Sequence, residues 1–595
     1  MPTADRLVAL RQRLASRGYD ALVIPRADEH LGEYIPPHNE RLRRATGFTG
    51  SAGMAVILRE QAAMFVDGRY TVQVRQQVPA ADFSYHHLIK KPPLQWLVDQ
   101  LKPGDRVAVD PRLHGLEWLR QAEAELLAAG LVLVQDTNNL VDACWDDRPA
   151  AQVLPALMLD EAHTGESSRS KRSRIGQAVQ ALGADGALIF APDSVSWLLN
   201  LRGRDVPCLP VLQSLALIWK DGSMDLVVEP ARLPAGWPAH CGAGVRVHAP
   251  AEAEALLMAQ AGKRILADPA SANAWSQQLL ERGGATLVAG TDPVVMPKAC
   301  KNAVEIAGAR AAHVRDAVAV VRFLAWLDRE QAAGNLHDEA ELADRLLAFR
   351  SAAAHFQGPS FDTISAAGSN AAMCHYNHRN GVPARLPPDS VYLVDSGAHY
   401  TDGTTDITRT VAIGNPGAEV RRLFTLVLKG HIALDQARFP DGTTGTHLDA
   451  LARQYLWREG HDYDHGTGHG VGAFLSVHEG PQRLAKAWSA APLKPGMIIS
   501  NEPGYYRDGA FGIRCENLMV VTAVDGDLET PMYGFESLTL VPFDQRLLDQ
   551  SLLDAGEVQW LDAYHDRVMT TIGPELPAAE RAWLEQACAP LTSTR

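Results

Sequence analysis

At 595 residues the chain is too long for one hydrophobic core, so several domains are expected. Its 46% hydrophobic and 21% charged residues are typical of an ordinary soluble globular protein. The formal net charge of −14 at pH 7 argues against nucleic acid as a partner, because phosphate binding needs a basic surface.

The sequence offers no targeting or membrane segment. Residues 1–20 form an amphipathic pattern and lack the apolar core and cleavage site of a secretory signal. No stretch approaches the roughly 18 apolar residues of a membrane span, so no membrane association is expected. The seven scattered cysteines include no CxxC pair, which favours reduced thiols and a cytoplasmic location. Cys515 is expected to be a small buried apolar residue.

The first half of the chain contains one pattern twice. Residues 5–24 and 172–190 each read as an amphipathic helix, a glycine and a buried apolar strand. A helix that ends at glycine and runs into such a strand is typical of an α/β unit, so two related α/β domains are expected. The alternative is that the helix–glycine–strand pattern recurs by chance, because any α/β protein contains such junctions. Further strands are predicted at 54–58, 62–70 and 106–110.

Two changes in composition mark domain boundaries. Residues 144–155 are marked by prolines and residues 161–174 are polar and charged, as in a linker or wrapping loop. A second boundary is predicted around 292–302, where Asn302 and Glu305 have capping-box spacing at the start of a long helix. The domains are therefore expected at 1–148, 149–300 and 301–595.

The last of these regions mixes helices with short strands and glycine-rich turns, an α+β arrangement. Helices are predicted at 340–352, 418–439, 550–569 and 577–588. The final two carry no recognisable chemistry, which indicates a packing or interface role.

Five potential metal ligands follow one another in the last third of the chain: Asp395, Asp406, His469, Glu502 and Glu516. Four carboxylates and one imidazole cannot share a pocket without a counter-charge, because their repulsion would raise their pKa values. Two divalent cations would neutralise the four negative charges. This arithmetic indicates a dinuclear metallohydrolase, in which two metals about 3.5–4 Å apart activate a bridging hydroxide.

Each ligand taken singly is better explained as a turn, loop or strand-end residue, and it is their combined setting that favours a site. Asp395 and Asp406 flank a tight turn at 400–403, so two antiparallel strands can present both carboxylates to one point. Glu502 ends an apolar run, where a rigid strand can hold it. The glycines around His469 allow the backbone to approach a crowded centre.

These residues resemble a known family. The five ligands, in this order, match the metal set of the creatinase/methionine-aminopeptidase superfamily, peptidase family M24, whose fold is called pita-bread. Four segments are similar to the long, three-domain form of Xaa-Pro aminopeptidase (aminopeptidase P): 358–378, 394–410, 465–481 and 501–517. The resemblance implies an α/β protein with two related N-terminal creatinase-like domains, followed by a C-terminal pita-bread catalytic domain with a helical extension.

The resemblance also implies roles for the ligands. Asp395 would bind one metal, Asp406 and Glu516 would bridge both, and His469 and Glu502 would complete the other. The family usually works with Mn²⁺, and an oxygen-rich set suits a hard divalent ion. Zinc, cobalt and iron stay open as alternatives.

Further residues match substrate-site positions of the family: His375, His465, His478, Tyr506 and Arg514. The histidines, with Glu502, are the expected catalytic groups, because imidazole titrates near working pH and can move protons. Arg514 stands two residues before Glu516, so on a strand it would share that residue's face and orient a carboxylate.

The implied function is release of the N-terminal residue from peptides with proline in the second position. A tertiary amide lacks N–H and fixes φ, so a pocket shaped for the ring accepts proline. The implied partners are such peptides and a second copy of the chain in a homodimer. The alternatives are a prolidase acting on Xaa-Pro dipeptides, a catalytically silent pita-bread module that binds peptides, and a creatinase-like C–N hydrolase.

Overall fold

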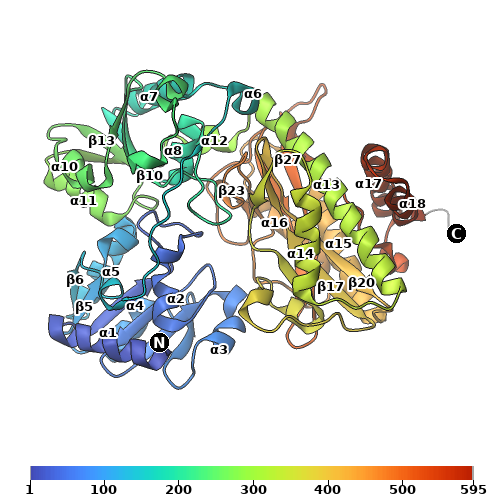
Figure 1. Ribbon diagram of the computed structural model, residues 1–595, viewed down its shortest axis with the longest axis horizontal. Helices are drawn as coiled ribbons and strands as arrows, with labels where there is room; N and C mark the ends of the chain where they lie inside the picture. The colour runs from blue at the N-terminus through green and yellow to red at the C-terminus, as the bar shows by residue number, and fades with distance from the viewer. Residues whose placement is uncertain (1, 592–595) are drawn as a thin grey trace. The chain divides into compact units, whose positions relative to one another are not determined.

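The computed structural model describes residues 2–591, which form two compact units (Figure 1). One unit comprises Met1–Asp160 with Glu166–Val295, and the other comprises Glu161–Gly165 with Met296–Arg595. Among the described residues, no helix is both long enough and apolar enough to cross a membrane.

The first unit contains two six-stranded sheets. The strands of one sheet, in order across it, are β4 (Ser84–His87), β3 (Ala62–Val66), β2 (Met54–Leu58), β1 (Ala21–Pro25), β5 (Arg106–Val109) and β6 (Val132–Gln135). Its helices are α1 (Thr3–Arg17), α2 (Arg41–Thr46), α3 (Gln73–Gln77), α4 (Pro93–Gln100) and α5 (Leu116–Ala128).

The second sheet has the same plan. Its strands, in order, are β12 (Val245–His248), β11 (Met224–Val228), β10 (Ser214–Trp219), β8 (Gly186–Ile189), β13 (Arg264–Ala267) and β14 (Thr286–Ala289). The helices of this region are α7 (Ser168–Ala181), α8 (Pro192–Leu199), α9 (Trp237–Cys241), α10 (Ala253–Met258) and α11 (Ala274–Arg282). Two short strands, β7 (Leu157–Met158) and β9 (Leu201–Arg202), pair separately.

The predicted duplication is confirmed by pairing and by detail. In each sheet the strand after the glycine pairs antiparallel with the next strand and parallel with a later one. Gly18 and Gly183 end equivalent helices with φ of 67° and 73°, a left-handed conformation that glycine adopts without strain. Asp20 and Asp185 then each exchange two hydrogen bonds with an arginine backbone, at Arg106 and Arg264 respectively.

The helices of the second unit include the longest of those in residues 2–591. They are α6 (Glu161–Thr164), α12 (Val295–Ala299), α13 (Ala303–Ala332), α14 (Glu339–Ser351), α15 (Ala418–Asp435), α16 (Gly445–Trp457), α17 (Ala555–Ile572) and α18 (Ala578–Ala587). The predicted capping box is confirmed, since Asn302 accepts from the Glu305 backbone and Glu305 accepts from the Asn302 backbone.

Its strands form several small sheets. One has the order β16 (Ile364–Ala367), β17 (Ser390–Ser396), β20 (Ile407–Ile413). A second has the order β21 (Phe439–Pro440), β28 (Met532–Ser537), β27 (Asn517–Ala523), β24 (Ile498–Asn501), β22 (Gly468–Gly470), β23 (Glu479–Leu484). The others are β15 (Phe356–Pro359) with β18 (Ala398–Tyr400) and β19 (Gly403–Thr404), and β25 (Gly504–Arg507) with β26 (Phe511–Arg514).

Some predicted bounds were wrong. The strand predicted at 62–70 ends at Val66, because Asp67 caps a short 3-10 turn. The helix predicted at 418–439 ends at Asp435, and Phe439 instead begins the edge strand β21. The helix predicted at 550–569 begins at Ala555, because the Asp554 carboxylate accepts a hydrogen bond from the Glu557 backbone and sets the helix start there.

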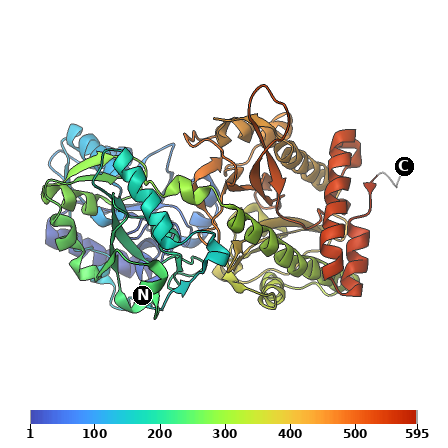
Figure 2. The same ribbon diagram turned by 90° about the horizontal axis from the view of Figure 1, so that it is seen from above.

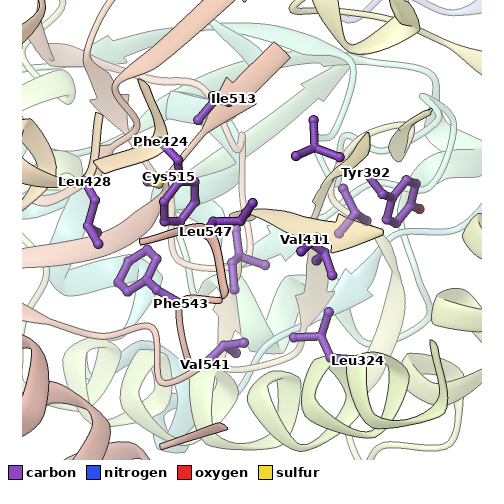
Figure 3. Packing of buried hydrophobic residues seen from close by; sticks show 14 of the residues in the cluster. Leu324, Tyr392, Val411, Phe424, Leu428, Ile513, Cys515, Val541, Phe543 and Leu547 are labelled. Carbon is purple, nitrogen blue, oxygen red and sulfur yellow. The ribbon is translucent and has the colours of Figure 1, made fainter. Parts of the chain in front are cut away.

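A large apolar core lies against β17 and β20 (Figure 3). Leu324 of α13, Val411 of β20 and Phe424 of α15 are all at least 95% buried in it. Burying one such side chain is worth about 1.5–3 kcal/mol, so this core holds the strands rigidly. Cys515 is fully buried here, as predicted, and burial raises the pKa of its thiol to about 12.

The two C-terminal helices lie side by side (Figure 2) and join the same core through apolar side chains such as Leu561 and Leu584, to which α17 adds a polar contact. The hydroxyl of Tyr564 on α17 donates to Val541 O at 2.9 Å and lies 3.2 Å from Arg409 Nη2. Arg409 is buried on β20 and donates to Glu516 O at 2.6 Å. The extension is therefore joined by hydrogen bonds to the strand beside a predicted ligand.

Tyr564→Phe removes this hydroxyl, so the buried Arg409 guanidinium and Val541 O each lose a hydrogen-bond partner. We expect the free energy of unfolding to fall by about 1–3 kcal/mol, measured by urea denaturation. Thr570→Ala, on the same helix but exposed, is the control and should change it by less than about 0.5 kcal/mol. Equal effects of the two changes would contradict a buttressing role for Tyr564.

Candidate metal centre

Two strand pairs present the candidate carboxylates. In β17 and β20, which pair antiparallel, Asp395 lies opposite Thr408, and Asp406 directly precedes β20. The predicted antiparallel arrangement of these two segments is therefore confirmed. Because both aspartates stand at the same end of this pair, the backbone directs them to one region.

The glutamates are placed in the same way by β24 and β27. Asn501 and Asn517 pair at the end of these antiparallel strands, so Glu502 and Glu516 flank that end. His469 lies on the neighbouring strand β22. A Cβ at Gly468 would stand 1.9 Å from Ser500 O, so only glycine permits this close approach of the histidine strand to β24.

The side chains converge. One ligand atom each from Asp406, His469 and Glu516 lie within 4.8 Å of one another. His469 Nε2 is 3.5 Å from Asp406 Oδ2 and 3.4 Å from Glu502 Oε1. Asp395 is linked to this group by Arg514, which also bonds the Thr408 hydroxyl that donates to Glu516. The structure thus brings together all five residues predicted as ligands.

The electrostatics of the cluster are those of a site short of positive charge. Burial first, and then the neighbouring carboxylates, raise the pKa of Asp406 and of Glu516 well above the ordinary range. Burial also raises the pKa of Glu502, although Arg514 opposes the shift. Divalent cations at this point would remove the repulsion and favour the ionised carboxylates.

The donor set fits such cations. His469 Nδ1 lies 3.0 Å from Gly470 O, and because a carbonyl only accepts, Nδ1 donates to it, which leaves Nε2, on the side of the carboxylates, as the ligand atom for a cation. Asp395 Oδ1 is buried and has no hydrogen-bond partner within residues 2–591. Carboxylate oxygens and one imidazole are ligands that hard divalent ions accept.

Arg514 and Thr408 form hydrogen bonds that hold the carboxylates of Asp395 and Glu516 in place. Arg514 Nη2 donates to Asp395 Oδ2 at 2.6 Å, and its Nε donates to Thr408 Oγ1 at 3.0 Å. Thr408 in turn donates to Glu516 Oε2 at 2.6 Å. These bonds orient ligands from different strands with respect to one another, as partners of metal ligands commonly do.

The expected geometry of Arg514 was wrong in one respect. Arg514 ends β26 and Glu516 precedes β27, so the two do not share the face of one strand. The arginine reaches Glu516 through Thr408 and forms its direct ion pair with Asp395. The two strands belong to different sheets, and Cys515 and Glu516, which connect them, lie in neither strand.

The predicted histidines and tyrosine occupy different places around the centre. The ring of His478 lies 4.2 Å from that of His469, centroid to centroid. His465 Nε2 is 2.8 Å from the Tyr506 hydroxyl, which accepts from Arg514 at 2.7 Å. His375 is half-buried and follows Cys374, whose carbonyl accepts from Arg514 at 3.3 Å.

The loop that leads to His469 is clamped by a residue that sequence patterns did not single out. Arg453 of α16 is fully buried, and its guanidinium lies 3.8 Å from the centroid of the Tyr463 ring. It donates to Asp449, to Tyr463 O and to His465 O. Its one sequence signal is the i, i+4 spacing from Asp449, which is common on helix surfaces.

Comparisons with known proteins agree with this architecture. The model of the creatinase/prolidase N-terminal domain matches residues 6–144, and a second such model matches 147–305. The model of metallopeptidase family M24 matches residues 307–523, and the model of the C-terminal region of peptidase M24 matches 531–591. The chain is thus built as an M24 metallopeptidase with two creatinase-type domains before the catalytic region.

Relatives that match over the full length of the chain identify its family. A probable Xaa-Pro aminopeptidase P of Tuber melanosporum is 38% identical and covers 99% of this chain and 99% of its own length. An aminopeptidase P1 of Lotus japonicus is 35% identical, again over 99% of both chains. The crystal structure of X-prolyl aminopeptidase from Caenorhabditis elegans matches with a TM-score of 0.95 and 34% identity, covering 99% of this chain and 100% of that one.

The C. elegans protein is described as a cytosolic enzyme with a di-nuclear active site. The chain belongs to the Xaa-Pro aminopeptidase P family, in its long form with three domains.

Thr408→Val keeps the shape of this side chain but removes its hydroxyl. Because Glu516 and Arg514 both lose a partner, we expect affinity for Mn²⁺ to fall by about 10-fold, measured by calorimetry on chelator-treated protein. Thr425→Val, also buried but bonded to Arg421 O and the Asp549 backbone, is the matched control and should bind Mn²⁺ as the original protein does. Unchanged affinity in Thr408→Val would contradict an orienting role.

The raised carboxyl pKa values give a pH dependence with a definite sign. Without metal, the folded state holds protons that the unfolded chain releases, so its stability falls as pH rises from the ordinary carboxyl range towards the raised pKa values. Bound cations displace these protons. We therefore expect the rise in melting temperature caused by Mn²⁺ to grow between about pH 5 and about pH 8. A rise independent of pH would contradict the linkage.

Proposed function

We propose that this protein is a metal-dependent aminopeptidase that removes the N-terminal residue from peptides with proline in the second position. The observation that carries the proposal is the convergence of four carboxylates and one imidazole, in a chain whose full-length relatives are named Xaa-Pro aminopeptidases. The membership of its catalytic region in family M24 supports the same conclusion.

The proposed centre holds two divalent cations. Asp395 would bind one of them, Asp406 and Glu516 would bridge both, and His469 and Glu502 would complete the other. The description of the C. elegans relative as di-nuclear supports this number, and the oxygen-rich donor set favours Mn²⁺ over softer ions. Two cations held there would polarise the scissile carbonyl and activate a water molecule for attack.

The chain's own groups then bind and orient the peptide. The acidic side chains attract the free α-amino group of the substrate, which limits cleavage to the first residue. His478, whose ring lies against His469, and His375 are proposed to hold the peptide carbonyl and to pass a proton to the departing proline nitrogen. His465 and Arg514 fix the Tyr506 hydroxyl between them, which positions it beside the substrate.

The alternatives carried from the sequence are less well supported. A prolidase would cleave only dipeptides, whereas relatives matched over the whole chain are named aminopeptidases. A silent peptide-binding module has no need of the ligand cluster, and all five ligands are retained here. A creatinase-like C–N hydrolase needs no metal, so the same cluster counts against it.

The organisation of the protein completes the proposal. Domain divisions at 148/149 and 300/301 are supported by the two equivalent sheets and by the ranges that the family models match. A cytoplasmic location is supported by the described cytosolic nature of the C. elegans relative. A homodimer is proposed from the family resemblance.

Asp406→Ala removes a proposed bridging ligand. We expect kcat to fall by at least about 10³-fold and the number of tightly bound metal ions to drop, while thermal stability changes little because a repelling charge is also lost. Asp402→Asn is the matched control: it lies four residues away, pairs with Arg315 and should stay active. Wild-type turnover by Asp406→Ala would overturn the assignment.

Substrate choice separates the aminopeptidase from the prolidase. With Mn²⁺ added, we expect an Arg-Pro-Pro peptide to lose its N-terminal arginine, and Arg-Ala-Pro to remain intact, as followed by mass spectrometry. Hydrolysis of Xaa-Pro dipeptides with no action on the longer peptide would instead identify a prolidase.

A further inference from the structure

A fully buried carboxylate outside the metal centre has an unusual set of partners. Glu339, the first residue of α14, is 0% exposed. Its Oε1 accepts from Ala367 N at 2.8 Å and from Asn370 Nδ2 at 2.9 Å. Its Oε2 accepts from the Tyr376 hydroxyl at 2.7 Å and from Ala384 N at 2.8 Å. Within residues 2–591, every hydrogen-bond donor on this carboxylate is an uncharged group.

All four donors belong to one segment, residues 367–384, which lies far from Glu339 in the sequence. They stand at its start, in its middle and at its end. Between them the segment runs through two short 3-10 turns, at Gly368–Ala372 and His378–Asn380. One side chain therefore fixes the path of the whole segment, which we name the Glu339 loop.

The Glu339 loop carries His375. On one side of this histidine, Tyr376 donates its hydroxyl to Glu339. On the other side, Cys374 O accepts from Arg514, the residue that also pairs with Asp395. His375 is thus held between an anchor on α14 and an anchor on the metal centre.

Burying a carboxylate that forms no ion pair within residues 2–591 is a costly way to hold a loop. Desolvating a carboxylate is costly, and hydrogen bonds to the charged group and the N-terminus of a helix offset that cost. An apolar side chain would fill the same space without the desolvation cost. The carboxylate adds specificity, because its four hydrogen bonds hold the backbone of the Glu339 loop in one conformation.

We propose that Glu339 is a positioning residue for the reaction, which holds His375 in place at the metal centre. The inference rests on the proposed function, in which His375 contacts the substrate carbonyl. It adds that the placement of this histidine is set from α14, by a residue that touches neither substrate nor metal.

Glu339→Gln tests this with little change of shape. Each carboxylate oxygen receives one backbone N–H, from Ala367 or from Ala384, and a backbone N–H cannot become an acceptor. Whichever oxygen is replaced by NH₂, one backbone anchor meets another donor and is broken. The loop then loses one of its ends while the volume of the side chain is preserved.

The decisive experiment is a double-mutant cycle of Glu339→Gln and His375→Ala, with kcat and KM measured on an Xaa-Pro peptide at full metal occupancy. We expect Glu339→Gln to lower kcat by about 10- to 100-fold, because misplacement by about 1 Å has effects of this size. In the His375→Ala background the same change should cost less than about twofold. Losses that multiply, or a His375→Ala protein as active as the original, would overturn the proposal.

Glu341→Gln is the matched control. Glu341 lies two residues further along α14, closes the capping box with Asp338 and bonds to His337 rather than to the donors of the Glu339 loop. Its replacement should lower stability without lowering kcat. A kcat loss in Glu341→Gln equal to that in Glu339→Gln would assign the effect to the helix rather than to the loop.

A second readout does not depend on activity. Hydrogen exchange in the Glu339→Gln protein should be faster in peptides covering 367–384 and unchanged over β17 and β27. If the original protein fails to cleave Xaa-Pro peptides, the proposed function falls while this exchange result still reports on the loop. Unchanged exchange in the loop would overturn the positioning role even in an active enzyme.

Discussion

Mutual repulsion among Asp395, Asp406, Glu502 and Glu516 is the constraint on which this catalytic unit depends. Asp395, Asp406 and Glu516 are buried and Glu502 is half-buried beside them, and burial with proximity raises the pKa of Asp406, Glu502 and Glu516. A fold can tolerate such a cluster only if cations enter it or if protons stay on it. The same property that makes the metal-free site unfavourable makes it selective for divalent ions.

The surrounding structure holds the repelling carboxylates in place with a rigid backbone. The antiparallel pairs β17–β20 and β24–β27 fix the backbone that carries the carboxylates. The apolar core of Figure 3 packs against β17 and β20. Buried arginines supply the fixed positive charge: Arg514 pairs with Asp395, and Arg409 donates to the backbone of Glu516. Through Tyr564, Arg409 also connects this strand to the C-terminal helices, which gives the extension a structural reason to be present.

Local patterns in the sequence predict much of this arrangement. The repeated helix–glycine–strand pattern predicts two related domains because the glycine must adopt positive φ at each helix end. The ligands are predicted because carboxylates and histidine in motif segments have few other reasons to combine. The Asn302 capping box predicts the residue at which α13 begins. Each of these signals is complete within a few residues of chain.

What the sequence does not predict depends on distant partners. Glu339 looks like any acidic residue at a helix start, and its role is defined by donors 28 to 45 residues away. Arg409 looks like a strand arginine, although its contacts lie as far away as Tyr564. The relation of Arg514 to Glu516 was misjudged because the strand is interrupted between them, and a periodic pattern reads the two strands, which belong to different sheets, as one. Tertiary contacts of this kind leave no local pattern.

The most direct test of the central claim is anomalous diffraction from crystals of this protein grown with Mn²⁺. Two manganese peaks per chain are predicted, about 3.5–4 Å apart, with the carboxylates of Asp406 and Glu516 between them. A single peak, or peaks away from these side chains, would contradict the account.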